Sequence, residues 1–123
     1  MVTKDDFRRA MSKFATGVTV VTTLDNNGEV HGMTANAFTS VCLEPAVLLV
    51  CVSHNARTCG YVEARGTFGV NILGTRQQSI GQYFAKRPED RHEDVEVPSS
   101  TTADGVPLLD GSLVSFSCRV VGS

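Results

Sequence analysis

Long apolar runs, blocks of like charge and paired cysteines are all missing from this chain of 123 residues. No apolar stretch approaches the roughly 20 residues of a membrane-spanning helix, and the first residues lack the basic flank and apolar run of a signal peptide. These absences predict a cytoplasmic protein without a membrane partner. Eleven basic and 13 acidic side chains give a net charge of -2 without long blocks of either sign, so no nucleic-acid partner is expected.

Residues that would form a metal site or a catalytic triad are also scarce. The sequence contains four cysteines and three histidines: Cys42, Cys51, Cys59, Cys118, His31, His54 and His92. The cysteines form no C-x-x-C pair, and in a reducing compartment they should remain thiols that serve as small buried side chains. The histidines lack the spacing of zinc ligands. No metal site is predicted.

The composition that remains is that of one ordinary globular domain. Hydrophobic residues make up 41% of the chain and charged residues 20%, which suits a folded protein with a conventional core. Because domains cluster at roughly 100 to 150 residues, residues 1–123 are interpreted as a single domain.

The first part of the chain predicts a helix followed by a hairpin. Over residues 3–15, apolar side chains recur at helical spacing, Thr3 is a plausible N-cap and Gly17 ends the helix. Its expected apolar face consists of Phe7, Ala10, Met11 and Phe14. Residues 18–24 are rich in β-branched side chains, and the turn sequence D-N-N-G separates them from a second strand at 29–33.

The rest of the chain alternates short strands with two helices. The continuous apolar run at 46–53 predicts a strand buried on both faces and central to its sheet. Helices are expected at 55–64 and 77–85, strands at 67–73 and 113–121, and a long surface loop at 86–104. Many short strands with two or three outer helices favour a mainly β protein that forms a partly closed antiparallel barrel.

Two polar segments stand out in this apolar setting. Residues 32–45 are rich in small hydroxyl and amide side chains; either they satisfy their own backbone in a wide connection, or they form a rim of donors and acceptors for a planar ligand. Residues 53–58 follow the apolar strand and lead into a helix. There hydroxyls, backbone N–H groups and the guanidinium of Arg57 would suit a phosphate, although ordinary helix capping and a solvated charge explain them too.

The order of these motifs resembles that of the flavin reductase-like, FMN-binding split-barrel proteins. The matching motifs are G-M-T-A-N-A-F-T-S-V-x-L-x-P-A, S-x-x-A-R-T, F-x-V-N-I-L and V-P-L-L-D-G, and the resemblance runs from Phe7 to Val121. It implies an antiparallel split β-barrel with Greek-key topology and flanking helices. It also implies a homodimeric oxidoreductase that transfers hydride from NADH or NADPH to FMN or FAD and supplies reduced flavin to a partner monooxygenase.

The resemblance assigns cofactor contacts to individual positions, while no side chain is implied to be catalytic because the flavin itself carries the redox chemistry. Residues 34–37 match positions along the ribityl chain and ring edge, 39–41 match the turn at the pyrimidine end, and Ser53, Arg57 and Thr58 match the phosphate grip. The loop over the flavin would contribute Phe84 and, less surely, Asp90 and Arg91; Phe84 suits a core position equally well, and Arg91 suits a solvated surface better than a contact. The matched positions are Thr34, Ala35, Asn36, Ala37, Thr39, Ser40, Val41, Ser53, Arg57, Thr58, Phe84 and Arg91.

Two departures from the family pattern keep other functions open. His92 stands where the family has an aromatic residue, and the chain stops at Ser123 before the G-D-H turn and last strand that supply a histidine near the nicotinamide. A flavin-binding protein without turnover is therefore the alternative function. A more remote alternative is a split barrel that binds another planar ligand, such as a pyridoxal compound or haem.

Overall fold

The structure is a computed structural model that describes residues 1–13, 17–54, 56–91 and 95–123. Every strand pairing in these residues is antiparallel. A four-stranded sheet has the order β2-β1-β5-β8, and the pairs β3-β4 and β6-β7 form two smaller sheets. The strands are β1 (Thr19–Leu24), β2 (Val30–Ala35), β3 (Phe38–Cys42), β4 (Val47–Val50), β5 (Thr67–Ile72), β6 (Ser99–Thr101), β7 (Pro107–Leu109) and β8 (Val114–Arg119).

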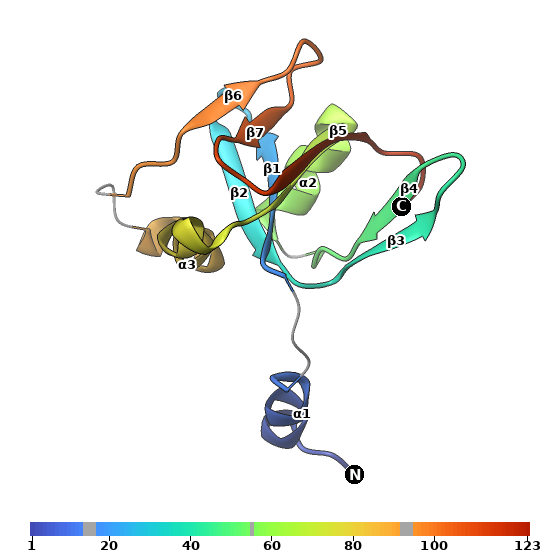
Figure 1. The fold of residues 1–123 in the computed structure, drawn as a ribbon, viewed down its shortest axis with the longest axis vertical. Coiled ribbons are helices and arrows are strands. Elements are labelled where there is room, and N and C mark those ends of the chain that lie inside the picture. Colours follow the sequence, from blue (N-terminus) through green and yellow to red (C-terminus); the bar gives the residue numbers. More distant parts are fainter. Residues whose placement is uncertain (14–16, 55, 92–94) are drawn as a thin grey trace.

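Three α-helices accompany the sheets (Figure 1). They are α1 (Lys4–Met11), α2 (Arg57–Arg65) and α3 (Gln78–Ala85), with short 3-10 turns η1 (Thr75–Gln77) and η2 (Pro88–Asp90). The prediction of a mainly β, antiparallel protein with flanking helices is thereby confirmed. Within the described residues, no helix is long and apolar enough to cross a bilayer.

The β1-β2 hairpin forms where turn chemistry predicted it. One Asp25 carboxylate oxygen accepts from the N–H of Asn27 at 2.8 Å and from that of Glu29 at 3.0 Å, and Gly28 takes a positive φ of 78° that other residues adopt with difficulty. Pairing then runs from Leu24 and Val30 at the turn to the far ends of both strands. The β-branched run of β1 is buried at the centre of the molecule.

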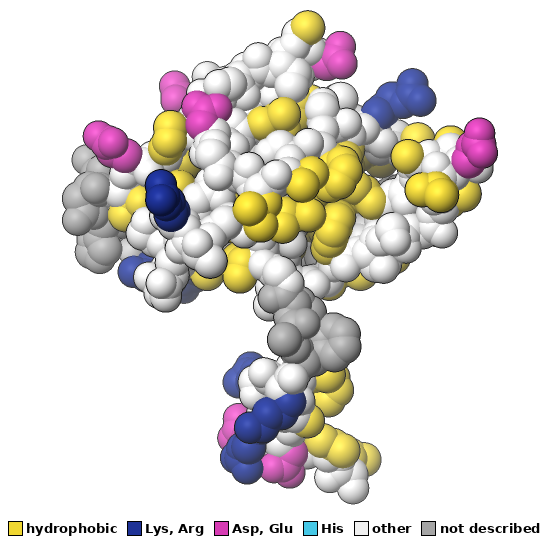
Figure 2. All heavy atoms as spheres, in the orientation of Figure 1, with side chains coloured by type: hydrophobic (Ala, Val, Ile, Leu, Met, Phe, Trp, Pro, Cys, Tyr) yellow, Lys and Arg dark blue, Asp and Glu magenta, His cyan; other side chains and the backbone are white. Residues whose placement is uncertain are grey.

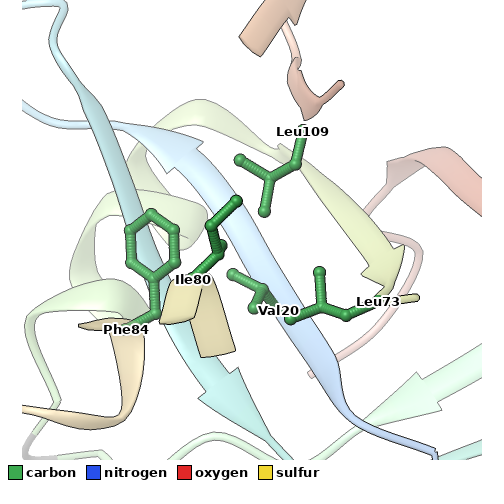
Figure 3. Close-up of a cluster of buried hydrophobic side chains, with 5 residues drawn as sticks. All are labelled: Val20, Leu73, Ile80, Phe84 and Leu109. Atoms are coloured by element: carbon green, nitrogen blue, oxygen red, sulfur yellow. The ribbon is translucent and has the colours of Figure 1, made fainter. Parts of the chain in front are cut away.

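The hydrophobic core forms against β1 and helix α3 (Figure 3). Val20 from β1 meets Ile80 and Phe84 from α3, together with Leu73 after β5 and Leu109 from β7. Phe84 is 4% exposed, so the expectation of a core position for this side chain is confirmed. The core thus fixes α3 and the segment after it against β2, beside the polar sites described below.

Gly69 in β5 lies too close to β1 and β7 to accept a side chain. A Cβ at this position would contact Thr22 Oγ1 and would lie 2.7 Å from the Pro107 carbonyl oxygen. We expect Gly69→Ala to lower the free energy of unfolding by about 2–3 kcal/mol, because backbone of β7 has to move to relieve the overlap. Urea denaturation measures the change. Gly60→Ala in α2 is the matched control; its Cβ meets nothing within 4 Å, and it should stabilise the protein by up to about 1 kcal/mol.

Helix α1 stands away from the body of the protein (Figure 1). Thr3 caps it as predicted, because its Oγ1 accepts from the N–H of Asp6 at 3.1 Å. None of its residues is buried, and Phe7 and Met11 are 60% and 51% exposed. Figure 2 shows its hydrophobic atoms along one side. The helix ends at Met11 with Ser12 as its C-cap, earlier than the predicted end at residue 15, and the expected position of Phe14 falls outside the described residues.

The structure contradicts the prediction that the apolar run at 46–53 is a central strand buried on both faces. Its strand is the short β4, which in the part of the chain that the structure describes pairs with β3 in a two-stranded sheet and does not join the large sheet. Leu49 is 51% exposed, so the strand is not buried on both faces. The prediction of buried cysteines is also wrong: two of the four free thiols are exposed and two are half-buried. Apolar side chains here cover a surface of the domain rather than fill its core.

The polar stretch 86–104 is more ordered than the predicted loop. It contains η2 and the strand β6, which pairs with the unpredicted strand β7. The helix predicted at 55–64 and the strand at 67–73 are confirmed as α2 and β5, and Gly66 ends α2 with a φ of 72°. The helix at 77–85 is confirmed as η1 and α3, and the last strand as β8.

Candidate functional site

The N-terminus of α2 presents an arginine at a helix start without a side-chain cap. Ala56 is the N-cap residue and offers no side-chain acceptor, whereas its own N–H donates to the Ser53 carbonyl at 3.0 Å. Arg57 is the first helical residue and Thr58 the second. The backbone N–H groups and positive dipole end of this nine-residue helix, together with the Arg57 guanidinium, favour an anion.

A cavity of about 330 Å³ lies beside this helix start. Its walls come from β2, α2, α3 and the segment around η2, and they include His31, Met33, Arg57, Thr58, Phe84 and Arg91. Three further charged side chains line it: Lys86, Arg87 and Glu89. Four of the positions that sequence reasoning assigned to the flavin therefore share one cavity.

His31 connects β2 to α2 within this cavity. Its Nε2 lies 3.0 Å from Oγ1 of Thr58, and its ring meets the edge of Tyr61 with centroids 5.0 Å apart. Burial lowers the pKa of His31 first, the positive charges of Arg91 and Arg57 lower it further, and Asp25 opposes them. Thr58 is only 1% exposed, so its hydroxyl is positioned by this contact.

Arg91 does not extend freely into solvent. Its guanidinium donates to the carbonyl oxygens of Gly32 at 2.8 Å, Phe84 at 3.3 Å and Lys86 at 3.1 Å. It also lies 5.2 Å from the Phe84 ring centroid, and burial lowers its pKa. The solvated interpretation of Arg91 is wrong, because these carbonyls fix it between β2 and the end of α3. Asp90, its neighbour, pairs with Arg87 at 3.0 Å.

Arg57 is engaged by a carboxylate from η2. Its guanidinium lies 3.3 Å from the Glu89 carboxylate, and the two side chains are 57% and 50% exposed. This ion pair places a negative group on the side chain expected to hold a phosphate. A phosphate bound at this position would compete with Glu89 for Arg57.

The other polar segment begins at the end of β2. Thr34 donates its hydroxyl to the Gly81 carbonyl at 2.7 Å, and Ala35 is buried. Asn36 lines a second cavity of about 290 Å³ whose walls also include Phe38 and Ile72. The Ala37 carbonyl then accepts from the N–H of Cys51 at 2.9 Å, which sets this segment beside the strand that leads to α2. This hydrogen bond joins the segment between β2 and β3 to the residue that follows β4.

The remaining predicted positions lie on β3 and before α2. Thr39, Ser40 and Val41 are exposed on β3, where the expected turn is a strand, and the Thr39 hydroxyl donates to the Ser40 carbonyl at 3.2 Å. Ser53 is also exposed and lies outside both cavities. The structure thus gathers Arg57, Thr58, Phe84 and Arg91 in one cavity and Asn36 in another.

Sequence reasoning missed four titratable residues that line the larger cavity. These are His31, Lys86, Arg87 and Glu89. His31 carries a usable signal, because it alternates with Met33 along β2 and so shares its face with a second cavity residue. The three charged residues fall in the stretch interpreted as a surface loop, where charge alone indicates no particular contact.

The family described as flavin reductase like domain matches residues 11–123. This chain belongs to that family. A curated relative from Rhodococcus sp, named NADH-dependent flavin reductase, is 44% identical over 124 residues, which cover 99% of this chain and 68% of the relative. The flavin reductase-like chain thus spans about two thirds of the length of the curated relatives it matches.

Solved structures of flavin reductases have the same fold. Flavin reductase PheA2 in its native state matches with a TM-score of 0.86 and 40% identity, covering 98% of this chain and 76% of that chain. The flavin reductase of styrene monooxygenase from Pseudomonas putida S12 gives a TM-score of 0.84 and 34% identity, covering 95% and 74% of the two chains. The split-barrel prediction is thereby confirmed for this flavin reductase-like protein.

Proposed function

We propose that this chain is the flavin-binding part of an NAD(P)H-dependent flavin reductase that uses FMN or FAD. Its membership of the flavin reductase-like family carries this proposal. The residues present fit a flavin phosphate, because an uncapped helix start, Arg57 and the Thr58 hydroxyl border one cavity. When bound, the flavin accepts hydride from the nicotinamide, so the protein needs only to bind and orient both molecules.

Each part of the site then has a distinct task. Arg57, Ser53 and the first N–H groups of α2 hold the phosphate, and the exposed polar edge from Asn36 to Val41 faces the ribityl chain and ring. The link from Cys51 to Ala37 supports this division, because it fixes the spacing between the two polar segments. Phe84 packs against β2 and keeps water out of one wall of the cavity of about 330 Å³ beside the start of α2, which we call the phosphate cavity.

The protein is proposed to act as a homodimer that supplies reduced flavin to a separate oxygenase. One of its structural relatives is the flavin reductase of a styrene monooxygenase, which supports an oxygenase partner. Apolar side chains are exposed on β3, β4, β8 and their connections, and Figure 2 shows a broad hydrophobic area near β8. Surfaces of this kind favour a second copy. Analytical ultracentrifugation tests the dimer; a monomer at micromolar concentration contradicts it.

The reductase is tested by mixing the purified protein with NADH or NADPH and free FMN or FAD under air. We expect oxidation of at least one nicotinamide, seen as loss of its absorbance, above a protein-free control. Flavin binding without oxidation indicates the non-catalytic alternative for residues 1–123. A protein that binds neither flavin contradicts both functions. Titration monitored by flavin fluorescence separates these outcomes.

The Glu89 carboxylate is expected to weaken flavin binding. Because its carboxylate occupies Arg57 at 3.3 Å, Glu89→Gln removes a competitor of the phosphate. We expect FMN to bind roughly two- to fivefold more tightly, the size of effect that an exposed ion pair produces. Fluorescence titration with FMN measures it. Glu63→Gln, on an exposed part of α2 outside the cavity, is the control, and riboflavin, which lacks the phosphate, should bind equally to all three proteins.

A further inference from the structure

His31 is a titratable residue of this cavity to which the proposed function gives no role. It lies on β2, paired in register with Thr23, and its side chain reaches across to α2. There its Nε2 lies 3.0 Å from the hydroxyl of Thr58, a buried residue at the second position of the helix that would hold the phosphate. His31 therefore contacts a proposed phosphate ligand rather than the phosphate itself.

The direction of this hydrogen bond decides what Thr58 can offer to an anion. A hydroxyl has one proton to donate. When Nε2 is unprotonated, the Thr58 hydroxyl donates to His31 and has nothing to give to a phosphate oxygen. When Nε2 carries a proton, it donates to Thr58 Oγ1, and the hydroxyl proton is available for the phosphate.

The neutral ring accepts from Thr58 when its single proton is on Nδ1, and the charges around His31 set how readily it becomes an imidazolium with a proton on both nitrogens. Arg57 from α2 and Arg91 after η2 disfavour the imidazolium, while Asp25 from the β1-β2 turn favours it. Tyr61 packs edge-on against the ring, and Glu89 offsets part of the Arg57 charge. A phosphate on Arg57 brings up to two negative charges next to this cluster, which reverses the effect of the two guanidinium groups.

We propose that His31 is a proton-linked positioning residue for the flavin phosphate: it takes up a proton from solvent as the phosphate binds and thereby turns the Thr58 hydroxyl toward it. This inference rests on the proposed function, because it assumes a flavin phosphate at Arg57. It adds that phosphate-bearing flavins bind more tightly as the pH falls, whereas riboflavin lacks this dependence on His31.

The direction of the pH dependence follows from the linkage between proton uptake by His31 and phosphate binding. In the free protein the pKa of His31 is lowered from its usual 6.5, and the bound phosphate raises it. Between these two values the complex binds more protons than its separated components, so affinity rises with falling pH. Below the lower value His31 is protonated in both states, and above the higher value in neither, so its contribution to the pH dependence ends.

The test compares wild type with His31→Gln, which keeps an N–H donor near the position of Nε2 but cannot take up a proton. FMN affinity is measured by calorimetry between about pH 6 and pH 8 in buffers of different ionisation enthalpy. We expect the affinity of wild type to rise by up to about tenfold per pH unit more steeply than that of the variant, with a matching loss of proton uptake in the variant.

The FMN phosphate titrates with a second pKa of about 6, but it does so in every variant and cancels in the difference. Equal slopes for wild type and His31→Gln overturn the inference while FMN binding and turnover leave the proposed function intact. The same dependence on His31 for riboflavin also overturns it. Failure of wild type to bind FMN overturns the proposed function instead. Should His31→Gln not fold, proton NMR titration of the wild-type histidines replaces it: the pKa of His31 must rise when FMN is added.

Discussion

Replacement of Arg57 by alanine is expected to weaken FMN binding by roughly 10- to 100-fold, the cost of losing charge-assisted hydrogen bonds to a phosphate. The side chain starts α2 at a position where Ala56 provides no cap, and it already holds a carboxylate, that of Glu89, at 3.3 Å. Riboflavin has no phosphate, so its affinity should stay unchanged. Fluorescence titration with both flavins measures the two effects side by side.

Two further variants make this prediction sharper. Arg65→Ala removes a cation from the opposite end of α2, where Arg65 donates to the Asp25 carbonyl at 3.0 Å, and it should leave FMN affinity near that of wild type. Arg57→Lys keeps the charge but loses the forked donors, so it should recover only part of the affinity. Equal losses for FMN and riboflavin in Arg57→Ala would mean that Arg57 supports the ring or the fold rather than the phosphate.

The sequence predicted those elements of the fold that depend on interactions between residues close together in the chain. The β1-β2 hairpin follows from a β-branched run and from a turn in which Asp25 accepts from two backbone N–H groups. The start of α1 depends on the side chain of Thr3, and the end of α2 depends on the left-handed backbone that Gly66 adopts; each is a single residue within one helical turn. Such signals involve residues a few positions apart, so one sequence suffices to detect them.

The burial of the apolar run of β4 could not be predicted from such local signals. Apolar side chains indicate that a segment avoids water, but they do not say whether the same domain or another protein surface covers it. In this chain Leu49 lies on a two-stranded sheet and remains half-exposed. Burial on both faces was the wrong inference because sequence periodicity does not distinguish a core from an exposed apolar face.

The site was predictable to a similar degree. Arg57 and Thr58 were predicted from a motif at a helix start, and the structure brings them into the same cavity as Phe84 and Arg91. His31 was missed because its contact with Thr58 joins residues 27 positions apart on different elements. Arg91 was interpreted as solvated because nothing in a polar stretch indicates which backbone carbonyls will accept from its guanidinium.

Substitution of Asn71 is expected to have the largest effect on the free energy of unfolding. This residue of β5 is completely buried, and its amide group donates to the Val20 carbonyl at 3.0 Å and to Thr22 Oγ1 at 3.1 Å. Its side-chain oxygen accepts from the N–H of Leu109 at 2.9 Å and from the Ser115 hydroxyl at 2.9 Å. One side chain therefore joins β1, β7 and β8 to β5, and a group that bonds on four sides has no equally good substitute of the same shape.

Asn71→Asp should lower the free energy of unfolding at about pH 8 by about 3–5 kcal/mol, because it buries a carboxylate and turns two donated bonds into contacts between acceptors. Burial raises the pKa of the new carboxyl group above its unfolded value, so stability is lost as the pH rises and is partly recovered at about pH 5, where a protonated carboxyl donates one bond. Urea denaturation of the flavin-free protein at both pH values measures this. Asn27→Asp, the same change in the exposed β1-β2 turn, should alter stability by no more than about 0.5 kcal/mol. If the two variants unfold alike, the four bonds of Asn71 do not hold the sheet together.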